Sequence, residues 1–277
     1  MKAVRSALIQ TAVVPDREAM VQKHLDLIAQ AARRGAQIIC LQELFCDVYL
    51  AATQDPRWHR GAEPIPGPTV ERMQEAARAH GVALVVPMHE EDQPGVYYNT
   101  AAVIDADGGL LGRYRKNHLP QQEGFEEKYY FRPGDLGYPV FQTQFARIGI
   151  FIDYDRHFPE VGRLLALQGA DILYNPCTTV VSLSKYLWLF EQRAIAMANG
   201  VFVGTVNRVG MESTHPGLFY GSSYFCDPFG EILAQGAEDR EEIVVADLNL
   251  DRIRQARELW PFFRDRRPET YSGLARG

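Results

Sequence analysis

Apolar runs of strand length alternate with helix-length amphipathic segments along most of this 277-residue chain, and this alternation limits the fold more than any other feature. Residues 4–10 and 36–42 have the apolar content of strands, and residues 16–34 between them carry apolar side chains on one helical face. The same order returns in the second half of the chain. Repeated strand–helix–strand segments, mixed with hairpins, predict an α/β fold in which helices cover a mixed sheet.

The remaining elements expected from the pattern are a helix at 69–80, a strand at 82–86, hairpin strands at 100–105 and 110–114, a strand at 148–152, a helix starting at 159, a strand at 171–174, a helix at 183–199, a strand at 201–206, hairpin strands at 222–225 and 232–234, a strand at 243–247 and a helix starting at 251. No break in composition marks a boundary between them. The sequence therefore predicts one domain over residues 1–277, in which residues from about 250 to 277 form a C-terminal helix and tail.

Composition narrows the class of protein. Hydrophobic residues make up 46% of the chain and charged residues 23%, which is typical of a globular protein with a large core. The net charge of −6 argues against a nucleic-acid partner. No run approaches the ~20 apolar residues of a membrane helix, and the first residues lack a signal-peptide core. The four cysteines form no Cys-x-x-Cys pair, which favours a reducing cytoplasm over disulfides or zinc.

Three apolar runs end directly in an ionisable residue: Glu43, Lys116 and Asp153. Taken alone, each could be a solvated loop residue or a helix cap. In layered α/β folds, however, functional groups collect where strands run out into loops. The three residues together therefore predict a single site.

The segments around these residues are Leu-Gln-Glu-Leu-Phe at 41–45, Tyr-Arg-Lys-Asn-His-Leu-Pro at 114–120 and Tyr-Asp-Arg-His-Phe-Pro-Glu at 154–160. They resemble the three motif blocks of the nitrilase (carbon–nitrogen hydrolase) superfamily, in the same order and across nearly the whole chain. Further segments look most like the β-ureidopropionase and N-carbamoyl amino acid amidohydrolase branch, namely 124–128, 131–140 and 207–210. The resemblance implies a four-layer αββα sandwich that pairs with a second copy into an αββα–αββα dimer or a larger homo-oligomer, with subunit contacts from the tail.

The resemblance also implies a mechanism. Members cleave C–N bonds through a covalent intermediate, in which a thiol attacks, a glutamate moves the proton and a lysine stabilises the oxyanion. By position, Glu43 is the base, Lys116 the oxyanion donor and Glu127 a second glutamate. Asp153 stands where the family has the nucleophilic cysteine. Cys177 could be a displaced nucleophile, but packing by a small residue is the favoured interpretation there.

Asp153 changes what the site is expected to do. A carboxylate attacking an amide would form an anhydride, so hydrolysis by the family route should be very weak or absent. Asp153 could instead act as a general base. Its charge should raise at least one neighbouring carboxyl pKa, with Lys116 as the only nearby matched cation. Three explanations stay open: an inactivated variant, a natural binding or scaffold protein without hydrolysis, or a natural member with Asp-dependent chemistry.

The expected ligand is a small N-carbamoyl or amide-bearing carboxylic acid, such as an N-carbamoyl-β-amino acid. In the family branch, an arginine at the position of Arg156 receives the substrate carboxylate; a structural ion pair with Asp155 or Glu160 is about equally compatible with the sequence. Asn175 and Thr178 are expected to add polar contacts. No metal or organic cofactor is expected, because no His, Cys and carboxylate set has ligand spacing.

Overall fold

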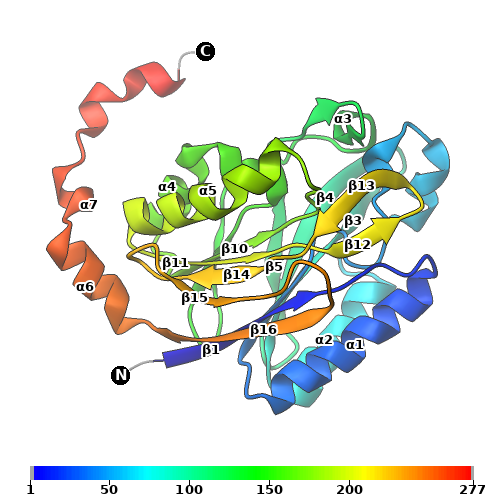
Figure 1. The fold of residues 1–277 in the computed structure, drawn as a ribbon, viewed down its shortest axis with the longest axis horizontal. Coiled ribbons are helices and arrows are strands. Elements are labelled where there is room, and N and C mark those ends of the chain that lie inside the picture. The colour runs from blue at the N-terminus through cyan, green and yellow to red at the C-terminus, as the bar shows by residue number, and fades with distance from the viewer. Residues whose placement is uncertain (1–2, 276–277) are drawn as a thin grey trace.

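The computed structural model describes residues 3–275; the last two residues of the expected tail, and the first two residues of the chain, lie outside the described range. Two six-stranded sheets pack face to face, and helices cover their outer faces (Figure 1). Two helices from the first half of the chain lie against one sheet, and two from the second half lie against the other. The layers are therefore α, β, β and α, as the resemblance implied.

The first sheet has the strand order β16-β1-β2-β3-β4-β5. Its strands are β1 (Ala3–Gln10), β2 (Ile38–Leu41), β3 (Ala83–Gln93), β4 (Val96–Ile104), β5 (Leu110–Arg115) and β16 (Glu242–Asn249). The two helices on it are α1 (Arg17–Arg33) and α2 (Pro68–His80). Asp16 caps α1 by accepting a hydrogen bond from the Ala19 N–H, and Gly81 ends α2 in the left-handed conformation at φ 64°.

The second sheet has the order β15-β14-β11-β10-β9-β8. Its strands are β8 (Val140–Gln142), β9 (Arg147–Ile150), β10 (Ile172–Pro176), β11 (Phe202–Val206), β14 (Tyr224–Cys226) and β15 (Ile232–Gln235). The helices on it are α4 (Pro159–Leu167) and α5 (Leu183–Asn199). Strands β9, β10 and β11 are parallel, so their carboxyl ends meet at one edge.

Short elements surround that edge. They are the ribbons β6 (Gln121–Gln122) with β7 (Phe125–Glu126) and β12 (Val209–Glu212) with β13 (His215–Tyr220), together with helix α3 (Glu127–Tyr130) and the 3-10 turns Leu50–Ala52, Pro56–Gly61 and Asp153–His157. The chain ends in α6 (Asp251–Leu259), α7 (Phe262–Asp265) and the 3-10 turns Pro268–Thr270 and Ser272–Ala275. This tail curves away from the two sheets along one side of the molecule (Figure 1).

Three apolar clusters hold the layers together. The central cluster lies between the two sheets, with Ile150 and Tyr174 from one sheet against Val85 and Tyr114 from the other. The outer clusters join each sheet to its pair of helices. Burial on both faces explains why the parallel strands are near-continuous apolar runs in the sequence.

The largest difference from the predicted elements is the β3–β4 hairpin. Apolar content predicted strands at 82–86 and 100–105, whereas β3 continues to Gln93 and β4 already begins at Val96. This extension is rich in polar residues and carries the buried Glu90, which binds Arg115 and Thr100. Apolar runs could not reveal a strand whose buried side chains are held by ion pairs.

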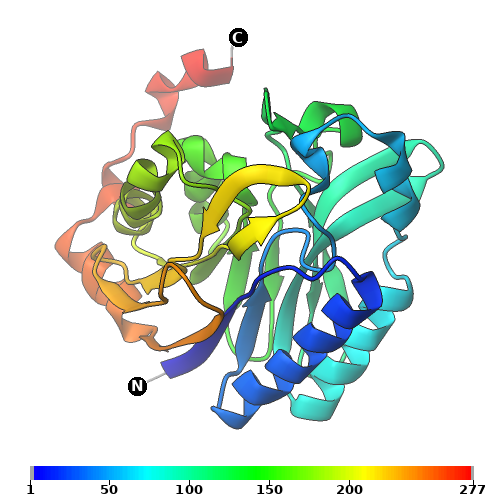
Figure 2. The same cartoon turned by 45° about the vertical axis from the view of Figure 1, so that its right-hand side comes forward.

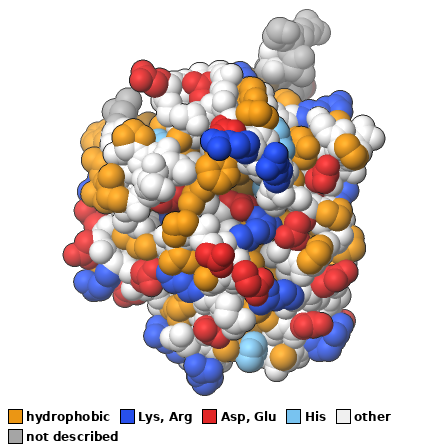
Figure 3. Space-filling view, turned by 90° about the vertical axis from the view of Figure 1, so that its right-hand side faces the viewer, with side chains coloured by type: hydrophobic (Ala, Val, Ile, Leu, Met, Phe, Trp, Pro, Cys, Tyr) orange, Lys and Arg blue, Asp and Glu red, His pale blue; other side chains and the backbone are white. Residues whose placement is uncertain are grey.

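Two further observations concern the apolar character of the helices and the distribution of surface charge. Of the helices in 3–275, none is both long enough and apolar enough to cross a membrane. Acidic and basic side chains are intermixed over the face of the molecule shown in Figure 3. That mixture agrees with the small net charge.

Candidate active site

The residues predicted from strand ends lie together at one edge of the sandwich. Glu43 follows β2 by two residues, and Lys116 comes directly after β5. Asp153 begins the turn that follows β9, and Glu127 begins α3. Because β2, β5 and β9 end at the same edge, side chains that are far apart in the sequence meet there.

Lys116 is the centre of the group. Its Nζ donates to Glu43 Oε1 at 2.9 Å and to both oxygens of Glu127 at 2.8 and 2.9 Å, and it lies 3.9 Å from Asp153 Oδ2. Glu43, Lys116 and Glu127 side chains are fully buried, and that of Asp153 is 9% exposed. Asn99 donates to Glu43 at 2.7 Å. The three carboxylates thus surround one ammonium group in a buried site.

Three oxygens from Glu43, Glu127 and Asp153 lie within 4.8 Å of one another, a grouping that also suits a metal ion. Spacing along the chain did not predict it, because the three residues come from separate loops. The Lys116 ammonium lies among these carboxylates and hydrogen-bonds to two of them. The lysine therefore already supplies the positive charge that the carboxylates require.

Burial and neighbouring charge decide the protonation of this group. Burial raises the pKa of Glu127 to about 8 and also raises the pKa of Glu43, while the attraction of Lys116 opposes both shifts. Burial opposes the charge on Lys116, but the three carboxylates outweigh it and raise the pKa of its ammonium. The expected rise of at least one carboxyl pKa is confirmed in direction, with burial as the largest cause.

Asp153 differs from the two glutamates. Burial favours its protonated form, but Arg156, Lys116 and His157 outweigh burial and hold the pKa of this carboxyl below its usual value. The expectation that Lys116 is the only nearby cation was wrong. Arg156 Nη1 donates to Asp153 Oδ1 at 2.6 Å, and its side chain is only 2% exposed. Residue 153 is therefore an ionised carboxylate held between two cations.

The backbone at Asp153 is strained. Its φ is +38°, in the left-handed region that non-glycine residues rarely occupy. Asp155 stabilises the turn, since its carboxylate accepts hydrogen bonds from the Ile152 N–H at 2.9 Å and from the His118 N–H at 3.0 Å. The Tyr114 hydroxyl also donates to Asp155 at 2.6 Å. Asp155 thereby ties the loop of Lys116 to the turn of Asp153.

Arg156 was expected either to receive a substrate carboxylate or to pair with Asp155 or Glu160. In the structure it pairs with Asp153, and its Nε lies 3.2 Å from Glu191 Oε2. Glu191 also contacts His157 Nδ1 at 2.6 Å. A substrate carboxylate would reach Arg156 only in competition with these two carboxylates, and whether it does so stays a prediction.

Thr178 lies in the site, where its hydroxyl donates to Glu43 Oε2 at 2.7 Å. Asn175 is fully buried beneath it and donates to the Phe151 carbonyl at 2.9 Å, while its Oδ1 lies 3.0 Å from Cys177 Sγ. Burial raises the pKa of the Cys177 thiol well above its usual value. A protonated, enclosed thiol is a poor nucleophile, which supports the packing interpretation.

Comparison with known proteins extends the resemblance. The family model for carbon–nitrogen hydrolase matches residues 5–258. N-carbamoylputrescine amidase of Solanum lycopersicum is 40% identical over 99% of this chain and 95% of its own length. Beta-ureidopropionase of Arabidopsis thaliana is 34% identical over 99% of this chain and 73% of its own length.

A solved structure agrees with the family match. The carbon–nitrogen hydrolase from Helicobacter pylori G27 superposes with a TM-score of 0.95 at 31% identity, covering 99% of each chain. The αββα layers, the grouping of Glu43, Lys116 and Glu127, and the family match over most of the sequence lead to one conclusion: this chain belongs to the carbon–nitrogen hydrolase family.

Proposed function

We propose that this chain binds a small N-carbamoyl compound at the site of Glu43, Lys116 and Glu127, and that Asp153 leaves its hydrolysis very weak or absent. The observation that carries the proposal is the 2.6 Å ion pair between Asp153 and Arg156. It places an ionised, doubly paired carboxylate at the position of the family nucleophile. Such a carboxylate is neither a useful nucleophile toward an amide nor a strong base.

The site otherwise retains what a urea group requires. Lys116 can donate to a carbonyl oxygen, and the buried carboxylates Glu43 and Glu127 can accept from the N–H groups of a carbamoyl amide. Thr178 fixes the orientation of Glu43. In this proposal, recognition of the urea end depends on residues other than residue 153.

The pairing of Arg156 indicates which chemical group the opposite end of the ligand carries. Because Arg156 is already paired with Asp153, it offers no free cation to a carboxylate. We infer an amine-ended compound of the N-carbamoylputrescine kind, in agreement with the 40%-identical relative, which is an N-carbamoylputrescine amidase. The N-carbamoyl carboxylic acid expected from the sequence is the alternative, and it requires Arg156 to leave Asp153.

Thermal shift and ammonia release on the unmodified chain test this proposal. N-carbamoylputrescine should raise the melting temperature, because a ligand that binds only the folded state stabilises it by mass action. Putrescine, which lacks the carbamoyl group, is the matched control and should not. N-carbamoyl-β-alanine and β-alanine form the second pair. No shift with either ureido compound would remove the proposal, and rapid ammonia release would refute the role given to Asp153.

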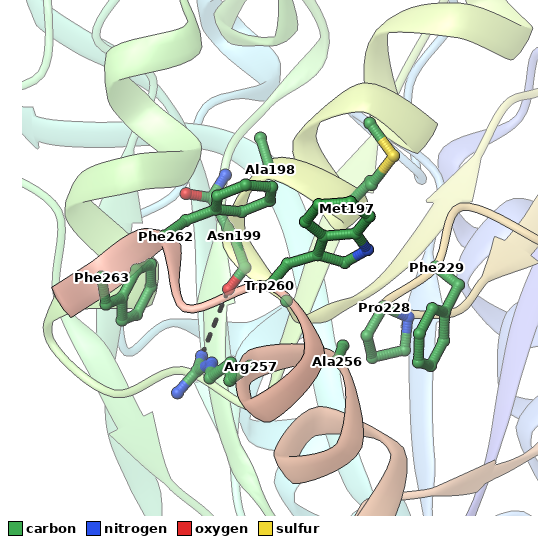
Figure 4. A pocket seen from close by; sticks show the side chains of 11 residues that line it. Met197, Ala198, Asn199, Pro228, Phe229, Ala256, Arg257, Trp260, Phe262 and Phe263 are labelled. Atoms are coloured by element: carbon green, nitrogen blue, oxygen red, sulfur yellow. Dashed lines mark hydrogen bonds between the residues drawn. The ribbon is translucent and has the colours of Figure 1, made fainter. Parts of the chain in front are cut away.

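We also propose a dimer, formed through α4, α5 and the tail. Exposed apolar side chains gather on these elements: Leu164, Leu167, Phe190, Met197, Leu259, Trp260, Phe262 and Leu274. A cavity of about 890 Å³ lies between α4, α5 and the tail. A smaller pocket of about 80 Å³ lies where Trp260, Phe262 and Phe263 approach the end of α5 (Figure 4). An apolar area of this kind on a monomer is typical of a protein interface.

Sedimentation velocity on the full chain should show twice the 31.3 kDa chain mass. Phe190→Glu should shift the population toward monomer, because it places a charge on the exposed apolar face of α5. Leu111→Glu, at an exposed leucine of β5, is the control and should remain dimeric. A parent chain that sediments as a monomer contradicts the proposed dimer.

We also propose a cytoplasmic location. It is supported by the four buried cysteines, which form no disulfide, and cell fractionation would test it.

A further inference from the structure

Arg208 is a fully buried arginine to which the chemistry above assigns no role. It follows β11 and precedes β12, within the Asn-Arg-Val-Gly segment at 207–210. The ribbon β12–β13 that follows it lies over the edge where the site is built (yellow in Figure 2). A buried guanidinium is costly unless its donors are satisfied, so its partners indicate its function.

Those partners are backbone carbonyls of the segment that carries Glu43. Arg208 Nη2 donates to the carbonyl of Glu43 at 2.8 Å and to that of Leu44 at 3.2 Å, and Nη1 donates to the carbonyl of Asp47 at 3.3 Å. Leu44 has a φ of +48°, which an ordinary residue holds only when its surroundings impose it. The planar guanidinium spans this bend and links three of its carbonyls.

Glu212 completes the contact. Its Oε1 accepts from Arg208 Nη1 at 2.5 Å, and its Oε2 accepts from the Tyr49 N–H at 2.6 Å. Tyr49 is the residue whose hydroxyl donates to Glu127 at 3.3 Å. The buried pair Arg208–Glu212 therefore contacts the segment that holds Glu43 at one end and the residue that touches Glu127 at the other.

We propose that Arg208, held by Glu212, is a positioning residue that fixes the carboxylates of Glu43 and Glu127 relative to Lys116. A merely structural ion pair would contribute to folding alone, and apolar residues could replace it without changing the site. The forked contact with the carbonyls next to Glu43 is a different arrangement. If Arg208 moves, the backbone that carries Glu43 moves with it, because the guanidinium is hydrogen-bonded to the carbonyls of Glu43 and Leu44.

Arg208→Lys is the direct test, because it keeps the charge and loses the fork. With glutamate labelled by carbon-13 at the side-chain carboxyl, NMR titration reads Glu43 and Glu127 directly in a chain that needs no activity. Glu43→Gln and Glu127→Gln identify the two signals. We expect Arg208→Lys to move the Glu43 titration midpoint by about 0.5 pH units or more, since the preserved charge leaves displacement as the cause. An unchanged midpoint in a folded Arg208→Lys chain overturns the proposal.

Two further variants keep the test decisive. Glu212→Gln keeps the size of the side chain but removes its charge and one of its two acceptor oxygens, and it should give a smaller shift of the same kind. It decides the outcome if Arg208→Lys does not fold. Arg252→Lys, at an ion pair with the buried Asp227 of the β14–β15 hairpin, is the matched control and should leave both titrations unchanged. Equal shifts in Arg252→Lys would mean that the effect is general.

A second, kinetic test of Arg208 rests on the proposed function. In an Asp153→Cys background that turns over, Arg208→Lys should lower kcat about 10- to 100-fold with KM changed less than about two-fold, as misplacement of a reacting group does. If Asp153→Cys shows no turnover, the proposed function fails while the NMR titration still decides the role of Arg208. A fall in kcat/KM carried by KM alone contradicts the positioning role.

Discussion

Asp153→Cys should release ammonia from an N-carbamoyl compound at least about 1000-fold faster than the parent chain. Removing the nucleophile of an enzyme commonly lowers its rate by this factor or more, and restoring it should give a comparable gain. The surrounding residues already meet the needs of a thiol. In the proposed mechanism Glu43 is the base, and Lys116 stabilises the oxyanion that forms when the carbonyl is attacked. On this proposal, only the attacking atom is missing from the group.

The cations that now hold Asp153 would also favour a thiolate. Lys116 lies 3.9 Å and Arg156 2.6 Å from the present carboxylate, and nearby positive charge lowers the pKa of a cysteine. The backbone opposes the change slightly. Aspartate tolerates the left-handed φ of +38° better than most residues, and the strain costs about 1 kcal/mol. This cost is small beside the gain from a nucleophile.

The assay is ammonia release from N-carbamoylputrescine and N-carbamoyl-β-alanine, with Asp153→Ala as the control that removes the charge without adding a nucleophile. Asp153→Ala should stay inactive, and Glu43→Gln should abolish the gain in the Asp153→Cys chain. A folded Asp153→Cys protein that releases ammonia from neither compound would show that the family match has identified the fold and not the substrate. Turnover by the parent chain at a similar rate would show that Asp153 itself supports hydrolysis.

The sequence predicts the site well where it depends on strand ends. Glu43, Lys116 and Asp153 each follow an apolar run, and the structure brings all three together. Continuous apolar runs predict buried parallel strands, and the loops that follow such strands must meet at one edge of the sheet. Order along the chain is enough for that inference.

The sequence does not predict which charges pair. Three carboxylates lie close to Arg156 in sequence, and the sequence does not show that Asp153 is the one that pairs with it while Asp155 and Glu160 do not. Its second partner, Glu191, comes from helix α5, much further along the chain. Thr178 contacts Glu43 across 135 positions. Such contacts arise from packing between the two sheets, and no local spacing rule contains them.

The ion pair between Asp153 and Arg156 should also contribute to the free energy of unfolding. Arg156→Gln leaves the largely buried Asp153 carboxylate with Lys116, at 3.9 Å, and His157 as the remaining groups that oppose the effect of burial. Removing one member of a buried pair costs about 3 kcal/mol in the free energy of unfolding. Asp153→Asn combined with Arg156→Gln replaces the pair by two neutral amides, and should recover to within about 1 kcal/mol of the parent chain.

The pH dependence distinguishes this pair from packing. In the parent chain the pKa of Asp153 is lowered, so its contribution to stability is present above the unfolded value of about 3.9 and is lost as the pH falls through the folded value. In Arg156→Gln, burial should raise that pKa instead. The folded variant then binds a proton that the unfolded chain has released, and its stability falls as the pH rises.

The deficit of Arg156→Gln relative to the parent should therefore be larger at about pH 7.5 than at about pH 5, as urea unfolding at the two values would measure. Arg147→Gln, at the exposed pair with Asp171, is the control and should change stability by less than about 1 kcal/mol at either pH. A deficit that is equal at both pH values would mean that Arg156 acts through packing alone. A deficit that grows with pH, and disappears in the double variant, would establish that Asp153 is held as a carboxylate by the arginine three residues after it.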